Sequence, residues 1–243
     1  MAIAALLAGA VRGQDNLLRD GEFDAYRETN PGPWEIRFGH KGGTYPDTRP
    51  SWHALSRTDP EHADIGRYVS IEKDGRGAGS ILIGQRVQLP DPLPILGLSV
   101  PYQCFCSGTD RSGIVALSVF TPKLWDSLPN ERSEADQSAP KGDIFHEVVK
   151  PQGEDVETWA NGRVASGQLR AALAPHAGTE VVVAVSFLTW HESNTEWAKF
   201  GGLWLGPPLP HIDPVGWPRY VYRAEPVTLR VDAYSPDADA TVT

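Results

Sequence analysis

The chain has only two cysteines, no dominant basic cluster, no apolar run long enough to cross a bilayer and few signs of helix. Two cysteines cannot supply a disulfide framework, and because there is no further cysteine to complete a metal site with them, we expect no metal there. They are Cys104 and Cys106, and a disulfide between such near neighbours would be strained. We therefore expect reduced thiols packed as small apolar side chains, with the strained disulfide as the alternative.

The charge and the N-terminal residues narrow the possible partners. The formal net charge is −9, and without a basic patch we expect neither nucleic acid nor an anionic membrane as a partner. Residues 2–11 are small and apolar but too few to span a bilayer. They are typical of the hydrophobic part of a secretory signal peptide, so residues 1–13 are interpreted as a signal-peptide remnant and the protein as secreted or extracytoplasmic. A packed or disordered tail is the alternative.

Motifs for catalysis are also missing. There is no Gly-x-Ser-x-Gly elbow, no His-Glu-x-x-His and no phosphate loop ending in Gly-Lys-Ser/Thr. The glycines between 75 and 79 precede a strand, so no helix N-terminus is available there for a phosphate. A glycosidase needs two carboxylates facing each other about 5–10 Å apart. Among 31 acidic residues, Glu192 and Glu196 are one arbitrary pair, so we expect no catalytic residues.

Turn-forming residues and short strands dominate what is present. The chain has 24 glycines and 21 prolines, about a fifth of its residues against roughly 12% on average. One short helix is expected at 167–174. Many short strands with little helix predict an all-β sandwich. The expected strands cover residues 67–72, 80–89, 113–120, 181–188 and 200–205, the first two being joined as a hairpin by a glycine-rich turn.

Two segments stand apart from this strand pattern. Residues 122–166 are polar and irregular, and are expected to form a long surface or binding loop. Residues 211–218 look like a linker, and 227–234 alternate as a strand. We therefore expect a main domain over 14–210. Residues 211–243 would be a linker followed by either a terminal strand of the sandwich or the start of a second β domain.

The most specific pattern lies near the start of the chain. Residues 16–24 read Asn-Leu-Leu-Arg-Asp-Gly-Glu-Phe-Asp and are soon followed by Pro-Gly-Pro-Trp at 31–34. We expect a short strand, a glycine turn, a buried Phe23 and a strand beginning at Trp34. The pattern resembles the opening Asn-Leu-Leu-x-Asn-Gly-x-Phe-Glu of jelly-roll carbohydrate-binding modules of the xylan- and glucan-binding, galactose-binding-domain-like type.

Later segments follow the same family in order, so that the resemblance covers about residues 16–209. A Gln-x-Val strand lies at 84–89, a Tyr strand at 101–102, a polar turn at 175–180 and a long apolar strand at 181–188. The resemblance implies a jelly-roll sandwich of two antiparallel sheets. In this family a structural Ca²⁺ often lies between the early acid, here Asp24, and an Asp pair in the final strand. Gly201 and Gly202 stand at that pair and offer only backbone carbonyls.

Tryptophan is the residue type best suited to binding a sugar, because its flat face can stack on the C–H face of a pyranose. Trp34 and Trp204 lie in strand-like settings and are expected in the core. The richest polar and aromatic group lies at 190–197, read as a hairpin-like turn. Loop aromatics reach the surface more readily, so the expected ligand-binding residues are Trp190, Glu192, Asn194 and Trp197, then Trp52 and Tyr45, with Trp125 and Trp159.

These observations lead to one functional expectation and two alternatives. We expect a non-catalytic carbohydrate-binding module of a secreted protein, which binds polysaccharide or oligosaccharide through exposed aromatic side chains and is joined to a further domain beyond Thr243. The first alternative is the same sandwich used as an accessory domain that packs on a neighbour. The second is a glycan hydrolase with a jelly-roll fold.

Overall fold

The structure is a computed structural model that describes residues 16–27, 29–39, 51–62, 65–74, 79–106, 113–130, 140–151, 153, 155–164, 166–189, 195–208, 211–215 and 230–234. Within these ranges, residues 51–53, 73–74, 106, 195, 211–215 and 230–234 are described by their backbone alone.

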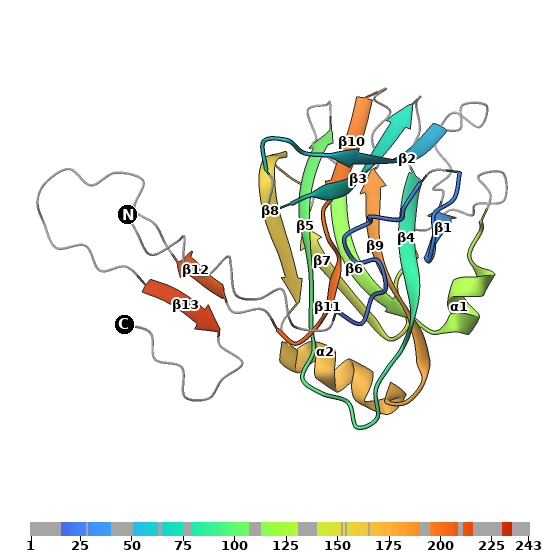
Figure 1. Ribbon diagram of the computed structural model, residues 1–243, viewed down its shortest axis with the longest axis vertical. Helices are drawn as coiled ribbons and strands as arrows, with labels where there is room; N and C mark the ends of the chain where they lie inside the picture. Colours follow the sequence, from blue (N-terminus) through green and yellow to red (C-terminus); the bar gives the residue numbers. More distant parts are fainter. Residues whose placement is uncertain are drawn as a thin grey trace, which may run out of the picture.

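Two antiparallel sheets pack face to face (Figure 1). Sheet one has the order β1 (Trp34–Gly39), β4 (Gly79–Gln88), β9 (Glu180–Thr189), β6 (Ile114–Phe120), β7 (Phe145–Lys150). Sheet two begins with β2 (Ser51–Thr58), β3 (Arg67–Asp74), β10 (Thr195–Phe200) and β5 (Gly97–Cys106), and β5 also pairs with β11 (Trp204–Gly206) and β8 (Val156–Val164). The fold is an all-β jelly-roll sandwich, as predicted.

Several connections between consecutive strands cross from one sheet to the other. β3 lies in sheet two and β4 in sheet one, so the hairpin expected between them is wrong. β9 and β10 also lie in different sheets, so these two strands do not pair as the hairpin that was expected around residues 190–197. Both segments are short enough to look like hairpin loops, and strand pairing depends on distant partners that loop length does not reveal. These crossovers, with the one from β5 to β6, are what make the sandwich a jelly roll.

Three further expectations about elements need correction. The opening residues 16–24 form turns, and β1 is the strand that starts at Trp34. The strand expected at 200–205 is interrupted, because β10 ends at Phe200 and β11 begins at Trp204. The segment 122–166 is not one long loop, since it contains α1 (Pro122–Ser127), β7 and β8. The predicted helix is present as α2 (Ser166–Leu173).

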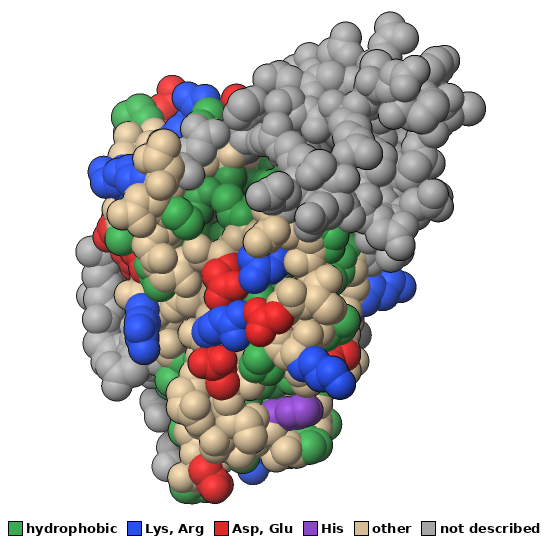
Figure 2. All heavy atoms as spheres, turned by 90° about the vertical axis from the view of Figure 1, so that its right-hand side faces the viewer, with side chains coloured by type: hydrophobic (Ala, Val, Ile, Leu, Met, Phe, Trp, Pro, Cys, Tyr) green, Lys and Arg blue, Asp and Glu red, His purple; other side chains and the backbone are tan. Residues whose placement is uncertain are grey.

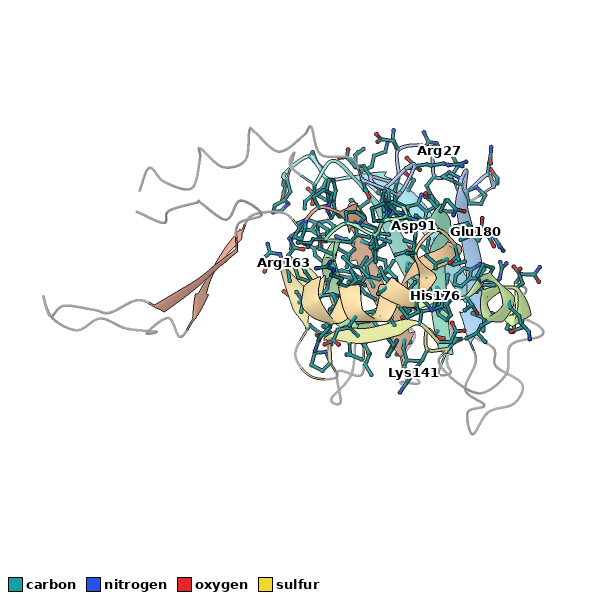
Figure 3. The ribbon with its side chains drawn as sticks, turned by 90° about the horizontal axis from the view of Figure 1, so that it is seen from below. Arg27, Asp91, Lys141, Arg163, His176 and Glu180 are labelled. Carbon is teal, nitrogen blue, oxygen red and sulfur yellow. The ribbon has the colours of Figure 1, made fainter. Side chains whose placement is uncertain are left out.

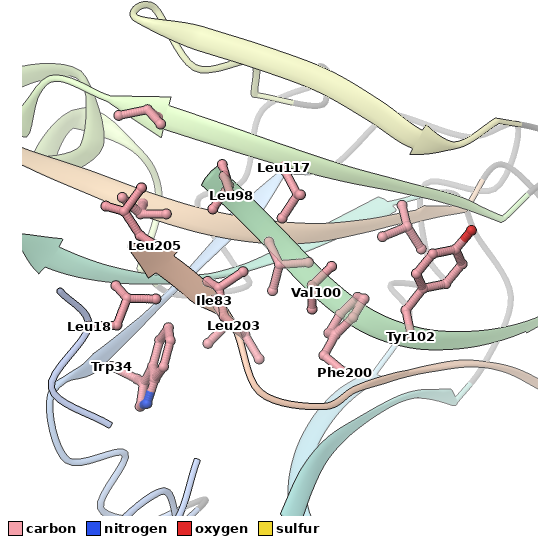
Figure 4. Packing of buried hydrophobic residues seen from close by; sticks show 14 of the residues in the cluster. Leu18, Trp34, Ile83, Leu98, Val100, Tyr102, Leu117, Phe200, Leu203 and Leu205 are labelled. Atoms are coloured by element: carbon pink, nitrogen blue, oxygen red, sulfur yellow. The ribbon is translucent and has the colours of Figure 1, made fainter. Parts of the chain in front are cut away.

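The core lies between the sheets and follows the alternation of each strand (Figure 4). Ile83 and Leu117 come from sheet one, and Leu98, Val100 and Phe200 come from sheet two; all are at most 1% exposed. Alternate positions on a strand point to opposite faces, so the intervening residues of sheet two point outward. Cys104 is a free, fully buried thiol in this core, as expected; the side chain of Cys106 lies outside the described part.

The opening motif joins the first residues of the sandwich to the segment around its last strand, β11. The side-chain nitrogen of Asn16 donates to the Leu203 carbonyl at 3.0 Å, and its oxygen accepts from the Leu205 amide at 3.0 Å. Phe23 is fully buried, as predicted, and its ring packs on that of Trp34 with centroids 4.5 Å apart. Trp34 is 2% exposed, which confirms its expected place in the core.

A second apolar cluster covers the outer face of sheet one. Thr121 caps α1, since its hydroxyl accepts from the Leu124 amide at 3.3 Å, and Pro122 follows at the start of the helix. The helix places Trp125 against Leu82 and other outward-facing residues of the sheet. Gly84 makes the room for this, because a Cβ there would lie 2.6 Å from the indole ring.

The remaining elements lie outside the two layers. Seen from below, α2 crosses one end of the sandwich (Figure 3). β12 (His211–Val215) and β13 (Arg230–Tyr234) pair with each other and, among the described strands, with no strand of either sheet. β12 lies within the segment expected as a linker, and β13 within the strand expected at 227–234. The domain boundaries at 14–210 and 211–243 remain a prediction.

Candidate functional site: a cleft on the outer face of sheet two

An open cleft of about 730 Å³ lies on the outer face of sheet two. Outward-facing residues of β3, β5 and β10 form its floor, and β8 and the connection from β2 to β3 contribute its wall. Its volume is within the range of small-ligand sites. The lining residues are Thr58, Asp59, Pro60, Glu61, His62, Tyr68, Gln103, Phe105, Glu157, Thr158, Trp197 and Lys199.

Two aromatic rings on the floor of the cleft are stacked against each other. Trp197 of β10 and Phe105 of β5 are paired directly across the ladder, and both are half-buried. Their ring centroids are 5.8 Å apart with the planes inclined by only 18°. The neighbouring residues Ala198 and Cys104 point into the core, so strand alternation holds both rings on the outer face. The pair gives the floor of the open cleft an aromatic, apolar surface.

Polar groups occupy the next row of the floor. Lys199 of β10 is paired with Gln103 of β5. The Lys199 ammonium lies 4.8 Å from the centre of the Trp197 ring and 5.4 Å from that of Tyr68. Contacts of this length between a cation and an aromatic face are attractive. The floor therefore places hydrogen-bond donors directly beside its aromatic pair.

Tyr68 and Trp159 meet at the border of the cleft, although they come from strands near opposite sides of sheet two. Their ring centroids are 5.7 Å apart at an angle of 70°, an edge-to-face contact. Tyr68 is 8% exposed, and its burial raises the pKa of the phenol. Gly201 lies beneath this region, where a Cβ would come within 3.2 Å of Ile65 and of Pro101. The missing side chain at Gly201 lets the β2–β3 connection settle over the sheet.

Asp59 holds that connection in place. Its carboxylate accepts from the Trp159 indole nitrogen at 2.9 Å and from the backbone amides of Glu61 and His62 at 2.9 and 3.1 Å, and it contacts the His62 Nδ1 at 3.0 Å. These bonds lower the pKa of Asp59 to about 2, and the hydrogen bond from Trp159 makes the largest contribution. We call the Asp59–Trp159 hydrogen bond the latch, because it fastens the β2–β3 connection to β8.

The structure brings two of the predicted ligand-binding residues to this cleft. Trp197 forms part of the floor, and Trp159 borders it through the latch. Tyr45, Trp190, Glu192 and Asn194 lie outside the described residues. Trp52 lies in β2, where its backbone pairs with Lys73, but its side chain is not described.

Trp125 is not exposed in this structure, contrary to expectation. It is fully buried beneath α1, and its indole nitrogen donates to Glu35 at 2.8 Å. A ring enclosed on all sides has no face to offer to a sugar. Glu196, suggested as half of a carboxylate pair, is 1% exposed and accepts from the Thr189 hydroxyl at 2.6 Å, so it does not line the cleft.

Sequence reasoning missed several residues of the cleft. Tyr68 lies in a strand whose alternation was recognised, and that alternation could have placed it on the outer face together with Ser70. Phe105 could have been found in the same way from Cys104. No sequence signal indicated Asp59, because its partner Trp159 is 100 residues away.

The residues expected for a structural Ca²⁺ do not fit such a site. The Asp24 side chain is 71% exposed, and its carboxylate lies 3.6 Å from the guanidinium of Arg67. Gly202 packs against the backbone of Gly21 and the stem of Glu22. Within the described residues there is no group of three or more His, Cys, Asp or Glu side chains that could hold a metal ion. An exposed carboxylate beside a cation is a poor cation ligand.

A second charged cluster lies along the side of the molecule where β1, β4 and α1 meet, and Figure 2 shows basic and acidic side chains alternating there. Arg86 binds Glu35 at 2.7 Å and also pairs with Asp126 of α1. Burial raises the pKa of Glu35, but hydrogen bonds from Arg86 and Trp125 outweigh it and the net pKa is lowered. The charged groups pair with one another, so we interpret the cluster as ion pairs that hold α1 against sheet one.

No family model matches the chain, and no curated protein matches it. Among solved structures it is similar to a family 61 carbohydrate-binding module in complex with β-1,4-galactotriose, with 12% identity, 79% of this chain and 97% of that chain covered, and a TM-score of 0.42. It is also similar to a family 11 carbohydrate-binding module of Clostridium thermocellum in complex with a mixed-linked tetrasaccharide, with 12% identity, coverage of 81% and 97%, and a TM-score of 0.41. Likenesses of this size carry no inference about a ligand.

A search for helices long and apolar enough to cross a membrane finds none among the described residues.

Proposed function

We propose that the protein is a non-catalytic carbohydrate-binding module that holds a polysaccharide or oligosaccharide in the cleft on sheet two. The observation that carries the proposal is the pair of near-parallel rings, Trp197 and Phe105, on a strand face next to the donors Lys199 and Gln103. A pyranose has an apolar C–H face and a rim of hydroxyls, so it needs this combination of flat aromatic surface and hydrogen-bonding groups.

The resemblance of residues 16–24 to the opening of jelly-roll carbohydrate-binding modules supports the same proposal. So does the choice of face. Residues that point outward from a central strand are normally polar or covered, whereas Trp197 and Phe105 are large apolar rings that line an open cleft. We further propose that the protein acts outside the cytoplasm, which follows from the signal-peptide interpretation of residues 1–13.

Affinity gel electrophoresis and calorimetry against plant, algal and bacterial polysaccharides test the proposal. We expect binding to at least one glycan, weakened about tenfold or more by Trp197→Ala, the usual effect of removing a central aromatic contact. Trp204→Ala is the matched control. Trp204 lies on β11 of the same sheet but does not line the cleft, and its indole nitrogen donates to Pro207 at 3.0 Å.

Two results would overturn the proposal. One is the absence of binding to every glycan tested. The other is a bound glycan whose affinity is the same for Trp197→Ala as for the unmodified protein. Thermal unfolding of both variants shows whether they are folded. A folded protein without glycan binding would favour the alternative of an accessory domain that packs on a neighbour.

A further inference from the structure

The ammonium of Lys199 is held in the middle of the cleft by aromatic faces. Its nitrogen lies near the rings of both Trp197 and Tyr68. Among the described residues it makes no ion pair. A cation–π contact is weaker than a well-formed pair with a desolvated carboxylate. The lysine is therefore placed where an incoming anion could improve its environment.

Gln103 adds a second hydrogen-bond donor beside Lys199. It lies opposite Lys199 on β5, is 6% exposed, and its side-chain amide makes no hydrogen bond with a described residue. Lysine supplies three N–H donors and the glutamine amide supplies two more. An ammonium and an amide side by side are suited to the two oxygens of a carboxylate, with the amide's own oxygen left for a hydroxyl.

A sugar that stacks on Trp197 meets Lys199, because the ammonium already lies against that ring. The ligand must either share the ring with the ammonium or move it away, and moving it costs the cation–π contact. A neutral hydroxyl returns little, whereas a carboxylate returns a charge-assisted hydrogen bond of about twice the strength. We propose that the cleft selects glycans that carry uronic acid residues, with the carboxylate bound by Lys199 and Gln103. This inference rests on the proposed carbohydrate-binding function.

The wall of the cleft restricts how much negative charge the ligand can carry. Asp59 is committed to the latch and to the β2–β3 connection, but Glu61 and Glu157 are exposed at the wall. The whole chain also has a net charge of −9. Closely spaced anions would meet these carboxylates, and screening over about 8–10 Å does not remove that repulsion within the cleft. The preferred ligand therefore carries isolated carboxylates on an otherwise neutral chain.

Matched pairs of polysaccharides test this inference. Glucuronoxylan, a glucuronate-bearing arabinogalactan and rhamnogalacturonan are each compared with their own carboxyl-reduced form, in which the uronate becomes a neutral hexose with the linkage unchanged. Dextran sulfate serves as the densely charged probe. We expect at least one native polymer to bind fivefold or more tightly than its reduced form, and dextran sulfate not to bind.

Variants assign the preference to Lys199. We expect Lys199→Met to bring the native-to-reduced affinity ratio close to one, and Lys199→Arg to keep it. Lys123→Met is the control, since Lys123 is exposed on α1 against the other sheet, and it should keep the ratio of the unmodified protein. Thermal unfolding confirms that each variant is folded.

The outcomes separate the two proposals. If glycans bind but native and reduced forms bind equally, or if Lys199→Met keeps the preference, the uronate inference is wrong and the carbohydrate-binding proposal stands. Tight binding of dextran sulfate would overturn the requirement for isolated charges. If neither the native nor the reduced polymers bind and the wider glycan panel is also negative, both proposals fall.

Discussion

Three tryptophans that looked alike in the sequence have different surroundings. Trp197 lines the cleft, Trp159 borders it, and Trp125 is enclosed under α1. The sequence around Trp125 is polar, which suggested exposure. The capping Thr121 and the Pro122 that follows it were the signal for a helix, and a short amphipathic helix must bury its apolar residue against something. What it covers, the outer face of sheet one beside Gly84, depends on tertiary packing that no local pattern reveals.

Replacing Trp125 should therefore affect stability and leave glycan binding intact. We expect Trp125→Ala to lower the free energy of unfolding by about 3–5 kcal/mol, as for other large core aromatics, because it also leaves Glu35 without its indole donor. Trp125→Phe should cost less. Urea unfolding measures the stability, and calorimetry on the folded fraction measures binding. Reduced affinity at unchanged stability would contradict our placement of this residue.

At the scale of elements, the alternation within strands could be predicted from the sequence, but the contacts between distant segments could not. The pattern of residues 67–72 correctly indicated a strand with Val69 and Ile71 on one face, and both are fully buried. The latch joins the β2–β3 connection to β8, two segments with no shared pattern. Short connections also hid which sheet each strand enters, because a four-residue segment can close a hairpin or cross between layers equally well.

The latch should make stability depend on pH in acid. The pKa of Asp59 is lowered to about 2 in the folded protein, so its contribution is present above the unfolded value near 4 and is lost as the pH falls toward 2. Because the cleft is open to solvent, we expect the loss to be only about 1 kcal/mol. Unfolding in urea between pH 4 and pH 2 should show a smaller loss for Asp59→Asn than for the unmodified protein. If the free energy of unfolding fell equally with pH in the two proteins, the Asp59 carboxylate would not be stabilised by these hydrogen bonds.

At the scale of the whole molecule, the order of strands followed from the sequence far better than their pairing. The family resemblance implied a jelly roll of two antiparallel sheets, and the structure has that fold. The resemblance also suggested a metal at Asp24, where the structure has an ion pair with Arg67 instead. A fold can be maintained by its apolar pattern while a polar site within it changes, so fold and site are predicted with different success.

Metal removal should have no effect on stability. Since Asp24 and Gly201–Gly202 do not form a cation site, we expect the thermal midpoint to be the same in excess EDTA and in millimolar Ca²⁺. Asp24→Asn should likewise shift it by less than about 1 °C, as is usual for an exposed ion pair. A clear rise in the midpoint with Ca²⁺ would contradict this prediction and show that the protein binds the ion at other residues.

The two sheets should fold without the residues beyond them. A fragment of residues 16–208 keeps every strand of the sandwich and the Asn16 hydrogen bonds to Leu203 and Leu205. We expect it to unfold in one cooperative transition and to bind the same glycans as the full chain. A fragment that starts after Gly21 loses those bonds and should be less stable by about 1–3 kcal/mol. Equal stability of the two fragments would argue against a role for the opening motif.

The hydrogen bonds of Asn16 to Leu203 and Leu205 form a clasp that also has a mechanical consequence. It holds the entry and the exit of the sandwich at one point, next to the amide of Leu17 bonded to the Leu205 carbonyl at 2.8 Å. If the chain on the two sides of the sandwich were pulled in opposite directions, the load would fall on these few bonds first. They would part before the strands that form the floor of the cleft carry any load. Breaking the clasp is reversible, since Asn16 can form the same hydrogen bonds again once the tension is released.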